Sequence, residues 1–182
     1  MDHLIKKSEI IQNKESELRR NRTFIILNKG GEIEVSPNSE DKKIYTNGVN
    51  GCTVTAIYSE CEDGSQKGIL THFESSFVKD NLDSIKKPER LLTKVQATVF
   101  VNYDEKDTYE PLNHVQNRMR SIDLIKKHLQ DVFGPNISIN VLPYKLTDNL
   151  DEDREISLVI KSKKDDTGYS AELNWWKGKI NL

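Results

Sequence analysis

Apolar and polar residues alternate in several short stretches of the chain, and this alternation predicts β-strands. The clearest case is KVQATVFVNY, in which every second residue from Val95 to Tyr103 is apolar or aromatic. The stretch CTVTAIYSE, beginning at Cys52, predicts a strand that is more deeply buried, because apolar residues fall on both of its faces. Similar patterns predict strands at Phe24–Leu27, Glu32–Val35, Ile69–Phe73, Ile137–Leu142, Arg154–Ser162 and Gly168–Trp176.

A different periodicity marks the helices. Between residues 111 and 133 apolar side chains recur every three or four positions, as on one face of a helix, and Gly134-Pro135 provides a stop signal. A shorter helix is expected in ESSFVKDNLDSIKK, which Pro88 ends or kinks. Residues 1–20 have a weaker helical pattern, typical of a marginal amphipathic helix or an arm. The apolar face of the long helix comprises Leu112, Val115, Met119, Ile122, Ile125, Leu129 and Val132.

This order of elements predicts the α+β class, with helices covering one face of a mostly antiparallel β-sheet. A length of 182 residues suits one domain with a core of its own. We therefore divide the chain into an N-terminal helix or arm, residues 1–22, and a single α+β domain, residues 23–182.

Composition and charge exclude several classes of protein. The net charge is −2, so no basic excess indicates a nucleic-acid partner. No apolar run is long enough for a membrane span, and the charged N-terminus is unlike a signal peptide. These features predict a protein that stays in the cytoplasm or is secreted or injected without a Sec signal peptide. Two cysteines suit a reducing compartment, and no spacing of Cys and His fits a metal site, so neither metal nor cofactor is expected.

Candidate chemistry is concentrated in YTNGVNGCTVTAIY, residues 45–58. Gly48 and Gly51 precede Cys52, and His72 follows on the next predicted strand. Asp63-Gly64 is a strong turn signal, so the two strands are expected to form a hairpin with Cys52 and His72 at its open end.

A cysteine nucleophile needs a base, a partner that orients the base, and N–H groups that stabilise an oxyanion. His72 is the candidate base, and the hydroxyl of Thr46 is placed to hold one nitrogen of its ring. The backbone at Gly48, Asn50 and Gly51 is the candidate source of oxyanion donors. The alternative is structural, because a lone cysteine at a strand start is usually a small buried apolar residue and a lone histidine usually supports the fold.

The other cysteine and histidines are weaker candidates. Cys61 lies near the predicted turn and is expected to be an exposed bystander. His114 and His128 fall on the long helix and are expected to face solvent, and His3 lies in the N-terminal arm.

The segment TNGVNGC, from Thr46 to Cys52, resembles the active-site segment of cysteine glutamine deamidases. Thr46, Gly48, Cys52 and His72 match the Thr, Gly, Cys and His of the chemoreceptor glutamine deamidases, the CheD family. Val49-Asn50-Gly51-Cys52 is similar to the Leu-Ser-Gly-Cys motif of deamidating toxins of the cytotoxic necrotising factor type. The related lethal-factor deamidases also have a Thr six residues before the Cys. The match covers roughly residues 44 to 73.

The resemblance implies a layered sandwich of β-sheet with helices on one side, and a protein glutamine deamidase with Cys52, His72 and Thr46 as its catalytic residues. Its partner would be a protein that carries the target glutamine. The chemoreceptor enzymes have a glycine-rich segment after the long helix, which INVLPYKLTDNLDEDREISLV lacks, so a toxin or effector is favoured over a chemotaxis enzyme. A catalytically inactive protein-binding module on the same scaffold is the alternative from another functional class.

Overall fold

The structure of the protein is a computed structural model that describes residues 21–49, 51–74, 78–86, 89–102, 112–144, 154–161 and 168–175. Residues 1–20 of the predicted N-terminal arm lie outside the described part of the chain. The last residue of that arm, Arg22, is the first residue of strand β1. The elements follow in the order β1 (Arg22–Phe24), β2 (Lys29–Val35), β3 (Lys42–Thr46), β4 (Cys52–Cys61), β5 (Gln66–Glu74), α2 (Val78–Asn81), η2 (Leu82–Ser84), β6 (Leu92–Asn102), α3 (Leu112–Phe133), β7 (Ser138–Tyr144), β8 (Arg154–Lys161) and β9 (Gly168–Trp175).

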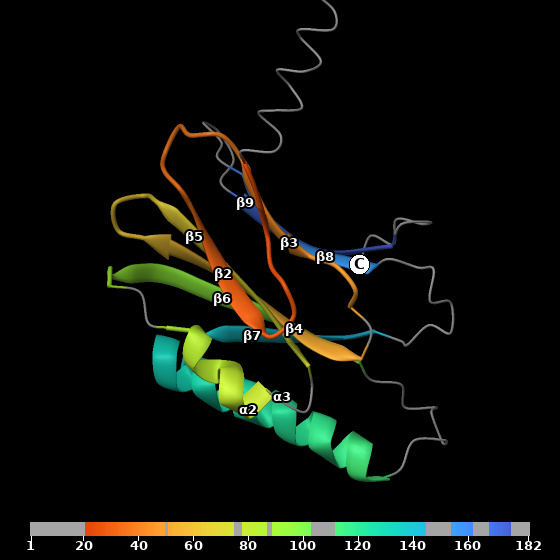
Figure 1. Cartoon of the computed structure of the whole chain (residues 1–182). Coiled ribbons are helices and arrows are strands. Elements are labelled where there is room, and N and C mark those ends of the chain that lie inside the picture. The colour runs from red at the N-terminus through yellow and green to blue at the C-terminus, as the bar shows by residue number, and fades with distance from the viewer. Residues whose placement is uncertain are drawn as a thin grey trace, which may run out of the picture.

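The strands form two mixed sheets (Figure 1). One has the strand order β1-β3-β8-β9 and the other the order β2-β5-β4-β6-β7. The pairs β1–β3 and β6–β7 are parallel, and the other described pairs are antiparallel. The parallel pair β6–β7 is joined through α3, since parallel neighbours need a long crossover connection. This mostly β structure with one long helix agrees with the predicted α+β class.

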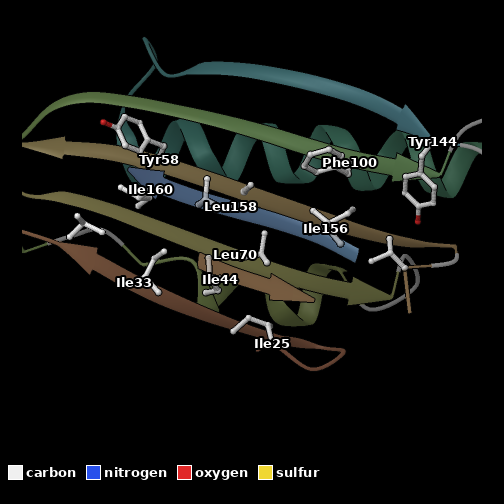
Figure 2. Packing of buried hydrophobic residues seen from close by; sticks show 14 residues of the cluster. Ile25, Ile33, Ile44, Tyr58, Leu70, Phe100, Tyr144, Ile156, Leu158 and Ile160 are labelled. Carbon is white, nitrogen blue, oxygen red and sulfur yellow. The ribbon is translucent and has the colours of Figure 1, made fainter. Parts of the chain in front are cut away.

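One hydrophobic core is built from side chains of both sheets (Figure 2). Alternation along β4 places Val54, Ala56 and Tyr58 in one buried cluster with Leu158 and Ile160 of β8. The sheets approach closely at Gly68, where an added Cβ would lie 2.7 Å from Ile160 Cδ1. Tyr58 and Tyr144 lie at opposite ends of this cluster in Figure 2.

A second core lies between the five-stranded sheet and the helices. The alternate residues of β4 and β6, among them Ile57 and Val99, pack in one cluster with Ile125 and Leu129 of α3. The predicted apolar face of the long helix is therefore confirmed at Ile125 and Leu129, while the side chains of Val115 and Met119 lie outside the described part. The helix ends at Phe133, and the following Gly134 has φ 98° and donates its N–H to the Gln130 carbonyl.

Three expectations from the sequence are corrected. Cys61 is the last residue of β4 and only 7% exposed, because the strand extends further toward the turn than its apolar pattern indicates. His128 is half-buried, with Nε2 3.1 Å from the Ile85 carbonyl oxygen, instead of facing solvent. The first strand is Arg22–Phe24, so most of the predicted strand Phe24–Leu27 lies beyond its end.

Candidate functional site

The connection between β3 and β4 carries the chain from one sheet to the other. Thr46 is the last residue of β3, and Cys52 is the first residue of β4. Gly48 and Gly51 have φ values of 69° and 80°, in the left-handed region that glycine adopts without steric cost. The glycines therefore shape this crossing between sheets, whereas Asn50, a candidate oxyanion residue, lies outside the described part of the chain.

The predicted hairpin is present in β4 and β5. Gly64 has φ 80° and donates its N–H to the Cys61 carbonyl, which closes the turn. In the register that follows, His72 lies opposite Val54, and Glu74 lies opposite Cys52. Cys52 and His72 are therefore diagonal neighbours on one face of the sheet, a relationship that usually separates residues by about 7–8 Å.

Thr46 and His72 meet across the two sheets. Thr46 Oγ1 lies 2.7 Å from the Ile25 carbonyl oxygen and 2.6 Å from His72 Nδ1. A carbonyl only accepts, so the single hydroxyl proton goes to Ile25. Nδ1 must then carry the ring proton and donate it to Oγ1. This chain of hydrogen bonds leaves the lone pair of the neutral imidazole on Nε2.

His72 Nε2 is buried and has no hydrogen-bond partner among the described residues. The whole residue is 2% exposed, and burial lowers the pKa of His72 to about 4, because the surroundings disfavour the charged ring. At neutral pH the ring is therefore uncharged and held by Thr46, and Nε2 is its basic nitrogen. Such a nitrogen accepts a proton from a donor that approaches it.

Two polar residues at the same end of the sheet are absent from the sequence interpretation. The Tyr144 hydroxyl, at the end of β7, donates to the Cys52 carbonyl oxygen. Asn102, at the end of β6, pairs in register with Tyr144 and is 2% exposed. For neither residue does the sequence offer a clear signal, because Asn102 shares its face of β6 with the polar residues Lys94, Gln96 and Thr98, of which none is fully buried.

Comparisons with known proteins identify no family. No family model matches the chain, and no curated protein matches it. Among solved structures, the chain is similar to the C-terminal domain of CNFy from Yersinia pseudotuberculosis, with a TM-score of 0.37 and 9% sequence identity. The similarity covers 88% of this chain and 57% of that one, so this chain spans less than two thirds of its length.

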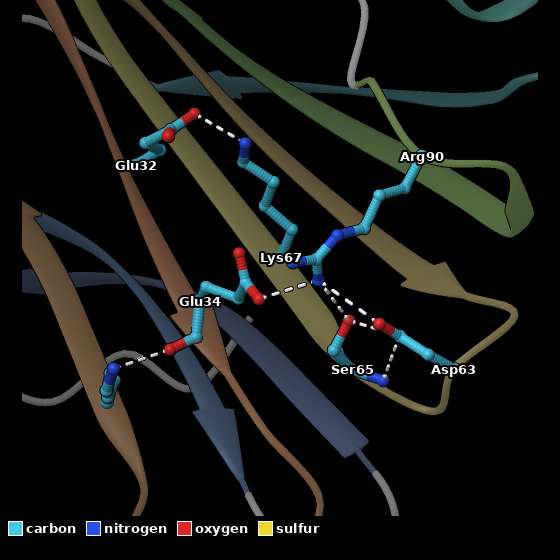
Figure 3. Close-up of polar contacts among 7 residues, drawn as sticks. Glu32, Glu34, Asp63, Ser65, Lys67 and Arg90 are labelled. Atoms are coloured by element: carbon cyan, nitrogen blue, oxygen red, sulfur yellow. Dashed lines mark hydrogen bonds and ion pairs between the residues drawn. The ribbon is translucent and has the colours of Figure 1, made fainter.

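A hollow of about 420 Å³ lies at the opposite end of β4, away from Cys52. Its lining includes Glu34, Lys67, Arg90 and Cys61. Arg90 Nη1 lies 2.8 Å from Glu34 Oε1. Figure 3 shows the same nitrogen in contact with Asp63 and Ser65 as well. The carboxylates of Glu34 and Asp63 raise the pKa of Arg90 and form ion pairs with its guanidinium. Such a group of ion pairs is typical of a structural link, here between β2 and the β4–β5 turn.

The described ranges offer neither a cluster of metal ligands nor a membrane-spanning helix. These residues contain no group of three or more His, Cys, Asp or Glu side chains placed to hold a metal ion. The same part of the chain contains no helix that is both long and apolar enough to cross a membrane.

Proposed function

We propose that the protein is a thiol-dependent amidohydrolase that converts a protein glutamine side chain to glutamate. The observation that carries the proposal is the Thr46–His72 hydrogen bond, which directs the free lone pair of His72 to Nε2. Cys52 lies on the same face of the same sheet, on the neighbouring strand and two residues from the partner of His72. The Thr-x-Gly-x-x-Gly-Cys sequence that resembles cysteine glutamine deamidases supports the same assignment.

In the proposed reaction His72 Nε2 takes the thiol proton as Cys52 Sγ forms a bond to the carboxamide carbon. The carbonyl electron pair moves to oxygen, and backbone N–H groups near Gly51 and Cys52 stabilise that oxyanion. The C–N bond then breaks, and the imidazolium gives its proton to departing ammonia. A water molecule hydrolyses the thioester, losing its proton to Nε2, and the carboxylic acid and the thiol are released.

The low pKa of His72 defines the resting state of this site. Since the neutral ring is favoured at pH 7, we propose that the thiol proton is transferred during attack rather than beforehand. Thr46 is a positioning residue, because it fixes both the tautomer and the plane of the ring. We also propose the layered fold that the deamidase resemblance implies, in which the helices cover one side of the β-sheet.

The substrate class follows from the chemistry. A buried thiol and an uncharged base suit attack on a neutral primary carboxamide. A target presented on a protein is expected from the resemblance, in the cytoplasm of the producing cell or of a cell that receives the protein. A chemoreceptor would serve as such a target, although the region after α3 lacks the glycine-rich segment of those enzymes.

A labelling experiment tests the function on all the proteins of a lysate at once. Bacterial and animal-cell lysates are incubated with the protein in H₂¹⁸O, and glutamine-containing peptides are compared by mass spectrometry. Deamidation through a thioester adds one oxygen from water, so a target glutamine should gain about three daltons. The Cys52→Ser variant is the control, and the Cys61→Ser variant should behave like the parent.

The alternative is a non-catalytic protein-binding module. The observation in its favour is the burial of both side chains, since Cys52 is 7% and His72 2% exposed. If no glutamine in either lysate gains label with the parent protein, the binding module becomes the better description.

A further inference from the structure

Asn102 is a buried amide at the same end of the sheet as Cys52. Its side-chain Nδ2 has no hydrogen-bond partner among the described residues, and the residue is 2% exposed. An unsatisfied buried amide N–H group opposes folding, because it loses its hydrogen bonds with water and gains none in return. A residue of this kind calls for an explanation beyond the stability of the fold.

The register between β4 and β6, when it is extended by two residues, places Asn102 beside Cys52. Strands β4 and β6 are antiparallel, and Val54 lies opposite Phe100. Moving two residues along each strand brings Asn102 opposite Cys52, on the face that both share with Val54 and Phe100. The buried cluster between the sheets includes Val54 and Phe100, so this is the face on which His72 meets Thr46.

The ladder between β4 and β6 stops short of this pair. Its last described partners at this end are Val54 and Phe100, and the Cys52 carbonyl accepts a hydrogen bond from the Tyr144 hydroxyl. Tyr144 is itself the register partner of Asn102. The backbone at Cys52 is thus anchored by the side chain of Tyr144, and the register partner of Tyr144, Asn102, has an unused donor at the same end of the sheet.

We propose that Asn102 is a catalytic residue whose Nδ2 donates a hydrogen bond to the oxygen of the attacked carboxamide. This role rests on the proposed function. When Cys52 Sγ bonds to the carbon, the carbonyl pair moves to oxygen, and a preformed donor stabilises the negative charge there. His72 and Asn102 flank Cys52 from β5 and β6, so base and oxyanion donor approach the reacting carbon from opposite sides. The ligand recognised is a primary carboxamide, whose oxygen accepts the hydrogen bond from Nδ2.

The Asn102→Leu variant separates catalysis from structure, because leucine has nearly the shape of asparagine and no polar atoms. Replacing an unsatisfied buried amide with an apolar side chain should leave Tm unchanged or raise it. The ¹⁸O-labelling rate at the glutamines modified by the parent protein should fall about 100- to 1000-fold, as for loss of one oxyanion donor. The fall should appear in kcat rather than in KM.

Alkylation of Cys52 by iodoacetamide provides the second readout. This displacement occurs at a CH₂ group and creates no oxyanion, so Asn102→Leu should leave the rate within about threefold of the parent.

The two proposals fail in different ways. If the parent protein labels glutamine and the Asn102→Leu variant does so at a rate within about threefold of the parent, the role of Asn102 is overturned. The proposed deamidase activity would then still stand. A clear fall in Tm in Asn102→Leu also overturns it, since the amide would then support the fold. A parent that labels no glutamine and alkylates Cys52 no faster than Cys61 overturns both proposals.

Discussion

Thr46 Oγ1 lies 2.6 Å from His72 Nδ1, so the last residue of a strand in one sheet holds the ring of a histidine in the other. The same hydroxyl donates to the Ile25 carbonyl, which leaves only one direction for the bond to His72. The proton is on Nδ1 and the lone pair is on Nε2. The contact between sheets thereby selects the tautomer that a general base requires.

Thr46→Val should therefore affect both stability and activity. Valine fills nearly the same space but leaves the Ile25 carbonyl and the His72 N–H without a partner. The free energy of unfolding should fall by about 1–3 kcal/mol, and glutamine labelling by about ten- to a hundredfold. Thr46→Ser keeps the hydroxyl and should retain most of both. Urea denaturation and the labelling assay measure the two effects, and equal behaviour of the Val and Ser variants would contradict the hydrogen-bond chain.

The lowered pKa of His72 predicts a specific pH dependence of stability. An unfolded histidine binds a proton below about pH 6.5, whereas the folded one does so only below about pH 4. Between these values the unfolded state binds more protons, so the free energy of unfolding falls as the pH is lowered, by up to about 3 kcal/mol in total.

The His72→Gln variant isolates this contribution from that of every other group. As the pH falls from 6.5 to 4, the free energy of unfolding of the parent should fall relative to that of the variant. Urea denaturation at several pH values measures it. Parallel curves for the two proteins would show that His72 is not buried in the neutral form.

Two leucines of α3 test which side of the helix meets the sheet. Leu129 is fully buried in the cluster beneath β4 and β6, while Leu124 is 39% exposed. Leu129→Ala should lower the free energy of unfolding by about 2–5 kcal/mol, because it removes buried methyl groups and leaves a cavity. Leu124→Ala should change it by about 0.5 kcal/mol or less. Similar losses in the two variants would mean that the orientation of α3 is wrong.

Gly68 tests the packing between the two sheets. A Cβ at this position would lie 2.7 Å from Ile160 Cδ1 and 2.9 Å from Leu158 Cδ2, both on the opposite sheet. Gly68→Ala should therefore destabilise the protein by about 1–3 kcal/mol through overpacking, despite the higher strand propensity of alanine. A thermal melt measures the change. A variant more stable than the parent would show that the two sheets lie further apart at Gly68 than these distances indicate.

The hairpin of β4 and β5 and the buried face of α3 were predictable from sequence, because each depends on local signals. Asp63-Gly64 specifies the turn, and the period of Ile125 and Leu129 specifies the helix. The division into two sheets was not predictable. Strand β3 contains only Ile44 and Thr46 at buried positions, after two lysines, so its alternation is too short to detect.

The candidate site was predictable in its residue types and only partly in its geometry. The glycine-rich run before Cys52 and the downstream His72 drew attention to two strands that the structure pairs. The direction of the Thr46 hydrogen bond depends on the carbonyl of Ile25, which no motif encodes. Tyr144 reaches Cys52, and Asn102 comes to the same end of the sheet, through the order β4-β6-β7, a tertiary arrangement that pairs residues far apart in the chain.

The two cysteines allow the proposed role of His72 as the base that activates Cys52 to be tested within one protein. Cys52 and Cys61 lie at opposite ends of β4, about 30 Å apart for a strand of this length, and both are 7% exposed. Exposure therefore does not distinguish them, whereas the basic Nε2 of His72 is near Cys52 alone. The difference between their reaction rates reports the presence of a base.

The most direct measurement is the rate of iodoacetamide alkylation at each cysteine at pH 7, followed by peptide mass spectrometry, in the parent protein and in His72→Gln. Cys52 should react at least about tenfold faster than Cys61 in the parent, and this advantage should disappear in the variant while Cys61 is unchanged. Equal rates at Cys52 and Cys61 in the parent, or a Cys52 rate that His72→Gln leaves unaltered, would contradict the assignment of His72 as the base that activates Cys52.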